Sequence, residues 1–390
     1  MRPRRGRKGY RSKATPEETE TAATIAADAG GKLRIAFVST MCLLDQVSGA
    51  AISMRSALET LAAAGHQVSA FTASSQGRKM TSEEAQRLYS GWHSWLARAR
   101  PEIVVSFGTS KLSRQLQAAA RDSSVRIVLY FGNAEIDVPD LVHPGDRAIC
   151  CSAFLAELYR ERYVVEAEVM YPVVRPERSR RLGLPVLADH PELRQLGFVT
   201  FINPIPYKGL TLVRRMIDRA GRERPGVKFL IIEGLAPREI MARMKVDLPG
   251  RPNVWWLPAQ LDMAAVYSRS AVLLMPSFWR EGFGRAVVEE QSAGVPVLAD
   301  DIGGLPEALG GSNTPLPIPE RCIENHHADL GPETVEAWFT ALTALWDDDE
   351  AYRRAVAQTR ETAERFSAEA TRARVLEIFT AIGAAVGDSR

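Results

Sequence analysis

The sequence predicts an α/β protein built from two doubly wound domains, one after the other. Its 390 residues exceed the usual size of a single compact domain and suit two. Short apolar runs rich in strand-forming residues alternate with helical patterns, and this alternation runs twice along the chain. An Arg- and Pro-rich stretch at residues 171–195 has no clear period and separates the two series. Both sheets are expected to be parallel, because strands that alternate with helices pair through right-handed crossovers.

The first series predicts an N-terminal domain over residues 33–180. Gly65 follows the first helical pattern and suits its C-terminal cap, because glycine adopts the left-handed conformation that ends many helices. The expected strands are 33–38, 67–72, 103–107, 125–131 and 148–152, and the expected helices are 50–64, 81–98, 111–120 and 153–163. Trp92 and Trp95 fall at helical spacing and are expected in the core.

The second series predicts a C-terminal domain over residues 196–365. We expect the last helix, within residues 366–390, to pack back on the N-terminal domain, with Ser367 as its N-cap. The expected strands are 197–202, 228–233, 254–257, 271–275 and one after Gly294, and the expected helices are 210–219, 237–244, 263–268, 335–346, 350–365 and 369–382.

Charge divides the chain unevenly. Residues 1–14 hold seven Lys and Arg and no acid, so the rest carries a formal charge of about −5 although the whole chain is +2. Residues 1–32 bury little and are expected to form a disordered basic leader. A basic arm that binds anionic lipid or nucleic acid is the alternative for this segment, whereas the folded body offers no nucleic-acid-binding face.

Composition indicates a reduced, cytoplasmic protein. The cysteines (Cys42, Cys150, Cys151 and Cys322) have neither C-x-x-C spacing nor the density of a disulfide framework. No apolar run approaches the ~18 residues that cross a bilayer, and the basic start lacks the apolar region of a secretory signal. Peripheral contact with the inner face of a membrane remains compatible with this composition.

The stretch at residues 276–307 groups features of a phosphate and sugar site. Gly282 and Gly284 bracket Phe283 where the chain turns from a loop into a helical pattern. Glycines permit a tight backbone there, and the free N–H groups of a helix start attract phosphate or sugar oxygens. A second pair of glycines, Gly303-Gly304, follows the next predicted strand.

Two carboxylates stand eight residues apart in this stretch, Glu281 before the turn and Glu289 within the helical pattern. A carboxylate that faces a crevice can accept hydrogen bonds from vicinal hydroxyls, as on a ribose. Two glutamates at this spacing also occur by chance, and an acid near a helix start suits the helix dipole. Spacing alone therefore leaves both explanations open.

The order of these residues resembles a known signature. P-S-x-x-x-E-G-F-G-x-x-x-x-E, followed by A-G-V-P-V and G-G-x-P-E, is similar to the motif region of retaining GT-B glycosyltransferases with the E-x7-E motif, the glycogen-synthase-like group (glycosyltransferase family 4). The resemblance is dense over residues 254–309 and weaker over the rest of 33–382. It implies two Rossmann-like domains that face a cleft.

The resemblance also implies roles for individual residues. Glu289 would hold the ribose of a nucleotide sugar and Glu281 the hydroxyls of the transferred sugar. Lys208, in Tyr207-Lys208-Gly209, would offset charge on the diphosphate leaving group. The implied catalytic residues are Lys208 and Glu281, and the implied nucleotide-sugar-binding residues are Gly49, Asn203, Gly282, Phe283, Gly284, Glu289, Gly303 and Gly304.

Three departures bear on the acceptor side and the diphosphate. Asn203-Pro204 stands where these enzymes usually carry Gly-Arg, so the partner arginine is missing from its place. Arg238, Arg280 or Arg285 could substitute, and spacing does not choose among them. The histidine usual after a middle strand of the first domain has no counterpart in residues 130–134, where Asn133 or Glu135 stands instead. The diglycine of the first loop is reduced to Ser48-Gly49.

The sequence therefore predicts a retaining glycosyltransferase that moves a hexose-type sugar from a nucleotide-diphosphate sugar to an unidentified acceptor: a glycan, a lipid-linked sugar or a small molecule. No cofactor or metal is expected beyond the nucleotide-sugar co-substrate, because the six histidines and the acids show no metal-ligand spacing. The alternative is a catalytically weak homologue that binds a nucleotide sugar or acts as a scaffold. An epimerase would require acids and a histidine that are not visible, and a dinucleotide-dependent oxidoreductase would require G-x-G-x-x-G after the first strand.

Overall fold

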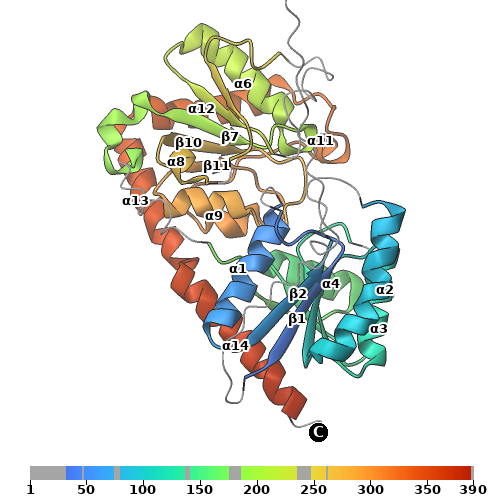
Figure 1. Cartoon of the computed structure of the whole chain (residues 1–390). Helices are drawn as coiled ribbons and strands as arrows, with labels where there is room; N and C mark the ends of the chain where they lie inside the picture. The colour runs from blue at the N-terminus through green and yellow to red at the C-terminus, as the bar shows by residue number, and fades with distance from the viewer. Residues whose placement is uncertain are drawn as a thin grey trace, which may run out of the picture.

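The computed structural model describes residues 32–45, 48–73, 80–136, 141–174, 186–234, 247–260 and 262–387. Nearly all of the expected leader and the whole expected helix 237–244 lie outside these ranges. The described residues form two parallel-sheet α/β domains, so the predicted fold class is confirmed. Figure 1 shows the N-terminal domain below the C-terminal domain, with the last helix running down along the lower one.

The N-terminal domain is built on a six-stranded parallel sheet of order β2-β1-β3-β4-β5-β6. The described strands are β1 (Arg34–Ser39), β2 (Gln67–Thr72), β3 (Ile103–Phe107), β4 (Arg126–Phe131), β5 (Arg147–Cys150) and β6 (Ala167–Val169), and the helices are α1 (Gly49–Ala63), α2 (Ser82–Ala99), α3 (Lys111–Asp122) and α4 (Ala153–Tyr163). Every predicted strand of this domain is present. The short edge strand β6 has no clear pattern in the sequence and was not predicted.

The C-terminal domain is built on a five-stranded parallel sheet of order β11-β10-β7-β8-β9. Its strands are β7 (Phe198–Ile202), β8 (Phe229–Ile232), β9 (Val254–Leu257), β10 (Ser270–Met275) and β11 (Val297–Ala299). Its described helices are η2 (Leu187–Asp189), η3 (Pro191–Leu196), η4 (Pro206–Lys208), α6 (Leu210–Glu223), α8 (Ala264–Tyr267), α9 (Arg285–Ser292), α10 (Leu305–Leu309), α11 (Glu320–Glu324), α12 (Pro332–Asp347) and α13 (Asp349–Arg365).

The end of the stretch expected to connect the domains packs into the C-terminal domain. Arg194, in η3, is buried, and its Nε donates to the carbonyls of Leu345 and Trp346 at 3.0 Å each. The same guanidinium pairs with Asp349 at the start of α13. These bonds satisfy carbonyls at the end of α12 that have no helical partner. Residues 175–185 lie outside the described ranges.

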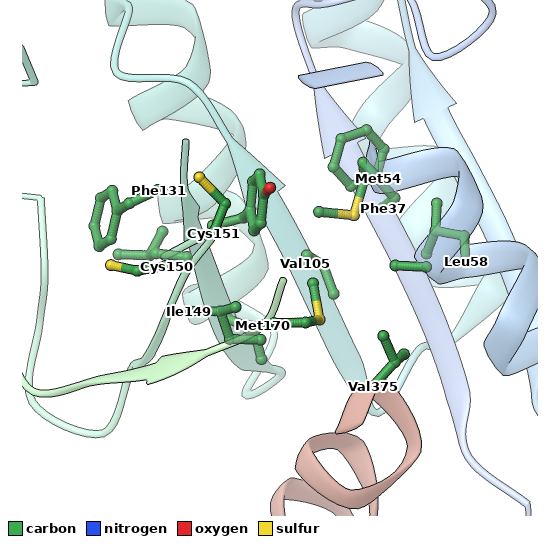
Figure 2. Close-up of a cluster of buried hydrophobic side chains, with 14 of the residues drawn as sticks. Phe37, Met54, Leu58, Val105, Phe131, Ile149, Cys150, Cys151, Met170 and Val375 are labelled. Atoms are coloured by element: carbon green, nitrogen blue, oxygen red, sulfur yellow. The ribbon is translucent and has the colours of Figure 1, made fainter. Parts of the chain in front are cut away.

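The last helix, α14 (Ala368–Gly387), lies against the N-terminal domain (Figure 1). Arg374 donates to Glu168 at 2.6 Å and to the carbonyl of Val169 at 3.1 Å, at the edge strand β6. Figure 2 shows Val375 of α14 pointing toward the core residues Met170 and Val105. At the start of the helix, the hydroxyl of Ser367 accepts from the N–H of Ala370 at 3.3 Å, as expected for its N-cap.

The two domains also meet directly at the start of α4. Both oxygens of Glu307, on α10, accept from the first backbone N–H groups of that helix, Ala153 at 2.8 Å and Phe154 at 2.9 Å. A carboxylate at this position is favourable because helix starts carry unpaired N–H groups and a partial positive charge. One acid of the C-terminal domain therefore caps a helix of the N-terminal domain.

The core of the N-terminal domain is apolar and aromatic. Figure 2 shows Phe37, Met54 and Leu58 grouped between β1 and α1. Trp92 is fully buried, its Nε1 donates to the carbonyl of Leu116 at 2.8 Å, and its ring stacks on Trp95 at 5.2 Å. The expectation that these two tryptophans belong to the core is confirmed. Among the described helices, none is long and apolar enough to cross a membrane.

A buried acid lies on the inner face of α9. Glu290 is fully buried, and its Oε1 contacts the hydroxyl of Ser270 at 3.1 Å. Its Oε2 has no hydrogen-bond partner within the described part of the chain. Burial raises the pKa of Glu290 well above its usual range, because an apolar surrounding disfavours the charged form, and nearby Glu289 raises it further.

Replacing Glu290 with glutamine should stabilise the fold at neutral pH. The folded state holds its proton above pH 4.5 while the unfolded chain releases it, so the native protein loses stability as pH rises. Glutamine does not titrate, so we expect Glu290→Gln to increase the free energy of unfolding by about 1–3 kcal/mol at pH 7.

Urea unfolding of both proteins between pH 4.5 and 7.5 measures this difference. The exposed Glu364→Gln is the matched control and should change stability little at any pH. An advantage of Glu290→Gln that stayed constant with pH, or grew toward pH 4.5, would contradict the raised pKa.

Candidate functional site

The site is placed by the order of strands in the second sheet. From β7 the chain proceeds to β8 and β9 on one side, and later to β10 and β11 on the other. Strands β7 and β10 are therefore neighbours at the point where the strand order reverses, with Leu274 paired to Phe201. Ligands of open α/β sheets bind beside the carboxyl ends of such strands. The loops after β7 and β10 carry Lys208 and Glu281.

The loop after β7 begins at Asn203, which has a left-handed backbone with φ of 61°. Its N–H donates to the carbonyl of Ile232 at 2.8 Å, and its own carbonyl accepts from Ile205 at 2.8 Å. Glycine adopts this conformation freely, and asparagine is among the few other residues that do so. The departure from glycine at position 203 thus preserves the shape of the backbone.

The same loop leads through η4 to Lys208 and Gly209, where it packs against the loop after β10. Gly209 has φ of 82°, and a Cβ there would lie 1.8 Å from the carbonyl oxygen of Pro276. Only glycine fits such an approach of two backbones. The N–H of Phe278 donates to the carbonyl of Tyr207 at 2.9 Å and ties the two loops together.

Lys208 and Glu281 form an ion pair between these loops. The Glu281 oxygen that meets Lys208 also accepts from the hydroxyl of Ser277 at 3.0 Å. The side chains are 18% and 12% exposed, so the pair is partly sheltered from water but remains open to it. Lys208, which the resemblance assigns to a diphosphate, and Glu281, which it assigns to a sugar, are therefore in direct contact.

Asp300, after β11, fixes the start of this loop. Its carboxylate accepts from the backbone N–H groups of Ser277 and of Ile302, the latter at 2.9 Å. Burial raises the pKa of Asp300 well above its usual range, although the two backbone bonds act in the opposite direction. The sequence gives no sign of this role, since an acid at a strand end has no distinctive pattern.

The turn Gly282–Gly284 lies in the crowded space between domains. A Cβ on Gly282 would lie 2.5 Å from the carbonyl oxygen of Gly132, in the N-terminal domain, and the carbonyl of Gly282 accepts from the hydroxyl of Ser152. Gly284 has φ of 93° and immediately precedes α9. The glycines of this turn are thus required by backbone shape and by contact with the other domain.

Gly303 and Gly304 pack directly behind the turn. A Cβ on Gly303 would lie 2.7 Å from the carbonyl oxygen of Glu281, and one on Gly304 would lie 2.6 Å from that of Gly282. The N–H of Gly304 donates to the carbonyl of Glu281 at 2.8 Å. This packing requires both glycines and supports the turn from behind.

The side chain of Phe283 points into an aromatic cluster. It is 3% exposed, and its ring lies 5.2 Å from that of Tyr171 and 5.2 Å from that of Phe366. These partners stand at the end of the N-terminal domain and just before α14. Phe283 can therefore offer a ligand only its main chain.

Glu289, inside α9, is held by two side chains. The hydroxyl of Tyr267, on α8, donates to one carboxylate oxygen, and Nε of Arg285 donates to the other. Burial raises the pKa of Tyr267 well above its usual range, and the nearby Glu289 charge adds to this effect. The phenol therefore remains a donor at neutral pH. Tyr267 has no signal in the sequence that would have identified it.

Gly49 belongs to the N-terminal side of the same region. It opens α1 after the N-cap Ser48, and a Cβ on it would meet nothing within 4 Å. One turn later, Ser53 donates to the carbonyl of Gly49 at 2.7 Å and lies 3.3 Å from a guanidinium nitrogen of Arg285. The helix start expected to face the ligand thus lies beside α9, which Figure 1 shows facing α1.

The loop after β4 stands where the resembled enzymes usually carry a histidine and this chain does not. The side-chain oxygen of Asn133 accepts from the N–H of Glu135 at 3.0 Å, and the backbone carbonyl of Asn133 accepts from the hydroxyl of Tyr159. Both bonds shape the loop itself. His143 is exposed and sits in a turn closed by Asp146, just before the start of β5 and so at the opposite end of the sheet.

The cysteines are buried thiols. Cys151 lies against the turn, 3.3 Å from where a Cβ on Gly282 would stand. Burial raises the pKa of Cys151 to about 12, and Glu307 and Glu281 contribute to the rise. Within the described residues, no three His, Cys, Asp or Glu side chains gather in a group that could hold a metal ion.

Part of the chain matches known proteins in sequence. Residues 194–348 match the family model described as glycosyl transferases group 1. Over 195 residues the chain is 29% identical to D-inositol 3-phosphate glycosyltransferase of Mycobacterium tuberculosis and Mycobacterium bovis. That match covers 48% of this chain and spans about a third (34%) of the length of those relatives.

Solved structures resemble the chain over most of its length. A glycosyltransferase from Rickettsia africae aligns with a TM-score of 0.67 and 15% identity, over 90% of this chain and 98% of that one. Anabaena Alr3699/HepE, solved with UDP and glucose, aligns with a TM-score of 0.61 and 15% identity, over 89% and 99% of the two chains. Residues 194–348 therefore resemble the glycosyl transferases group 1 family, and the chain as a whole has the two-domain fold of GT-B glycosyltransferases.

Proposed function

We propose that the chain transfers a hexose-type sugar from a nucleotide-diphosphate sugar to an acceptor, with retention of the anomeric configuration. The observation that carries the proposal is the Lys208–Glu281 ion pair at the strand-order reversal of the second sheet, beside the glycine turn and Glu289. The family match supports sugar transfer, and the UDP bound to Anabaena Alr3699/HepE supports a nucleotide donor. A glycan, a lipid-linked sugar or a small molecule would serve as the acceptor.

The donor would lie across the carboxyl ends of β7 and β10. Glu289 would accept hydrogen bonds from the ribose hydroxyls, and Glu281 from hydroxyls of the transferred sugar. The N–H groups of the turn Gly282–Gly284 and of Gly49 at the start of α1 would face phosphate oxygens. Asn203, Gly303 and Gly304 would act by holding the two loops in this shape.

In the reaction the bond between the anomeric carbon and the diphosphate oxygen breaks, and a bond to the acceptor oxygen forms on the same face of the sugar. The acceptor proton passes to the departing phosphate. Negative charge grows on the diphosphate as it leaves, and Lys208 would stabilise that charge. Closure of the cleft between the domains would exclude water, which competes with the acceptor.

We further propose that no cofactor or metal ion takes part, and that the protein acts in the cytoplasm or peripherally at the inner face of a membrane. Lys208 at the diphosphate position supports the first point, since a lysine can balance charge that a metal would otherwise balance. Activity unchanged by EDTA is the expected result, and loss of activity restored by Mg²⁺ would exclude it.

Calorimetry with UDP and GDP should detect binding that depends on Glu289. We expect Glu289→Ala to weaken binding about tenfold to a hundredfold, because hydrogen bonds to a carboxylate contribute about 1.5–3 kcal/mol. The 2′-deoxy nucleotide tests the assigned contact directly. It should bind the native protein less tightly than the ribonucleotide but bind Glu289→Ala equally.

The exposed Glu324→Ala on α11 is the matched control and should leave both affinities unchanged. If Glu289→Ala still distinguished the ribonucleotide from the deoxy form as the native protein does, the ribose contact would lie elsewhere.

Release of nucleoside diphosphate from a panel of nucleotide sugars tests the reaction. With a productive donor, Lys208→Ala should lower kcat about 10²- to 10³-fold, because it removes a charge that matters most in the transition state. Its melting temperature, measured in parallel, separates this loss from a folding defect, because the Glu281 carboxylate is left without its partner. Donor binding without turnover under any acceptor would favour a catalytically weak, sugar-nucleotide-binding homologue, and the absence of any donor binding would refute the transferase function.

A further inference from the structure

Arg285 is the first residue of α9 and lies at the boundary between the domains. Its Nε donates to Glu289 in its own helix, and its Nη1 lies 3.3 Å from the hydroxyl of Ser53 on α1. The side chain is 17% exposed. Arg285 is therefore not a solvated residue on the outer face of the helix.

Helix stability does not explain an arginine here. A cation in the first turn of a helix opposes the macrodipole, which favours acids at that end. The pair with Glu289 also has the cation before the acid at i,i+4, the less stabilising of the two orders. Position 285 therefore carries a charge that the local helix disfavours, and a role outside the helix is required to account for it.

The charges around the turn form two matched pairs. Lys208 pairs with Glu281 on one side of Gly282–Gly284, and Arg285 pairs with Glu289 on the other. Each pair is partly buried, so removing either partner would leave a poorly hydrated charge. A nucleotide sugar offers hydroxyls that suit the carboxylates and a diphosphate that suits the cations. Its binding can therefore exchange both pairs, because the cations gain phosphate oxygens as partners and the carboxylates gain hydrogen bonds from the hydroxyls.

Other arginines fit this role less well. Asn203 and Pro204 occupy the place where an arginine was expected on the β7 loop. Arg280, in the loop that carries Glu281, is exposed. Arg238 lies outside the described residues. Arg285 is sheltered, already paired with one of the two assigned carboxylates, and directed toward the N-terminal domain.

We propose that Arg285 is the second cation of the diphosphate site: it is released from Glu289 when ribose hydroxyls bind that carboxylate, and it then contacts the phosphates across from Lys208. Because Arg285 also contacts Ser53, its position would depend on whether α1 lies close to α9. This assignment rests on the proposed function, because it presupposes a nucleotide diphosphate at the turn.

The test compares UDP and uridine, or GDP and guanosine if GDP binds more tightly, by calorimetry and competition. Arg285→Ala should lower the affinity for the nucleoside diphosphate about tenfold to a hundredfold. It should leave the affinity for the nucleoside unchanged or raise it, because Glu289 is then free to bind the ribose. Arg285→Lys should restore part of the diphosphate affinity. Arg280→Ala, in the loop that precedes α9, is the matched control and should change neither affinity.

If Arg285→Ala lowered the affinities for the nucleoside diphosphate and for the nucleoside equally, the proposal would be overturned, because Arg285 would then only position Glu289. No loss for either ligand would overturn it as well. Melting temperatures of Arg285→Ala and of the double variant with Glu289→Ala separate a folding defect from a binding defect. If the native protein bound neither UDP nor GDP, the proposed function itself would fail and this role would fail with it.

Discussion

Close approach of backbones around residues 281–284 is the constraint on which the site depends. Gly209 lies against Pro276, Gly282 against Gly132, and Gly303 and Gly304 against the back of the turn. A Cβ at each of these contacts would overlap a main-chain atom, so the loops could not close around one another with larger residues. The ion pair of Lys208 and Glu281 forms because these loops are brought so near.

Much of the architecture could be predicted because its signals are local. Strand-forming apolar runs, helical periodicity and caps such as Gly65 and Ser367 depend on neighbours in the sequence. Edge strand β6 was not predictable in this way, because three residues carry no period and their pairing with β5 is decided by tertiary contact. The packing of η3 onto α12 likewise depends on one buried guanidinium, Arg194, and on distant carbonyls.

The candidate site likewise has a part that the sequence indicates and a part that it does not. The motif resemblance pointed to Glu281, Glu289 and the glycine turn, since all of them lie in one stretch. A motif cannot predict contacts between residues that are distant in the sequence. These include the contact of Tyr267 with Glu289, of Asp300 with the loop of Ser277, and of Glu307 with the start of α4. The left-handed backbone of Asn203 explains why asparagine can stand in place of glycine there, which spacing alone could not disclose.

The aromatic cluster of Tyr171, Phe283 and Phe366 gives the molecule a mechanical property. The chain passes between the domains after Tyr171 and again after Phe366, and the rings of these two residues lie 5.1 Å apart. Phe283 is the third ring of this cluster, and its main chain belongs to the glycine turn. Displacement of either Tyr171 or Phe366 would therefore press directly on a side chain of the turn, because the three rings are in mutual contact.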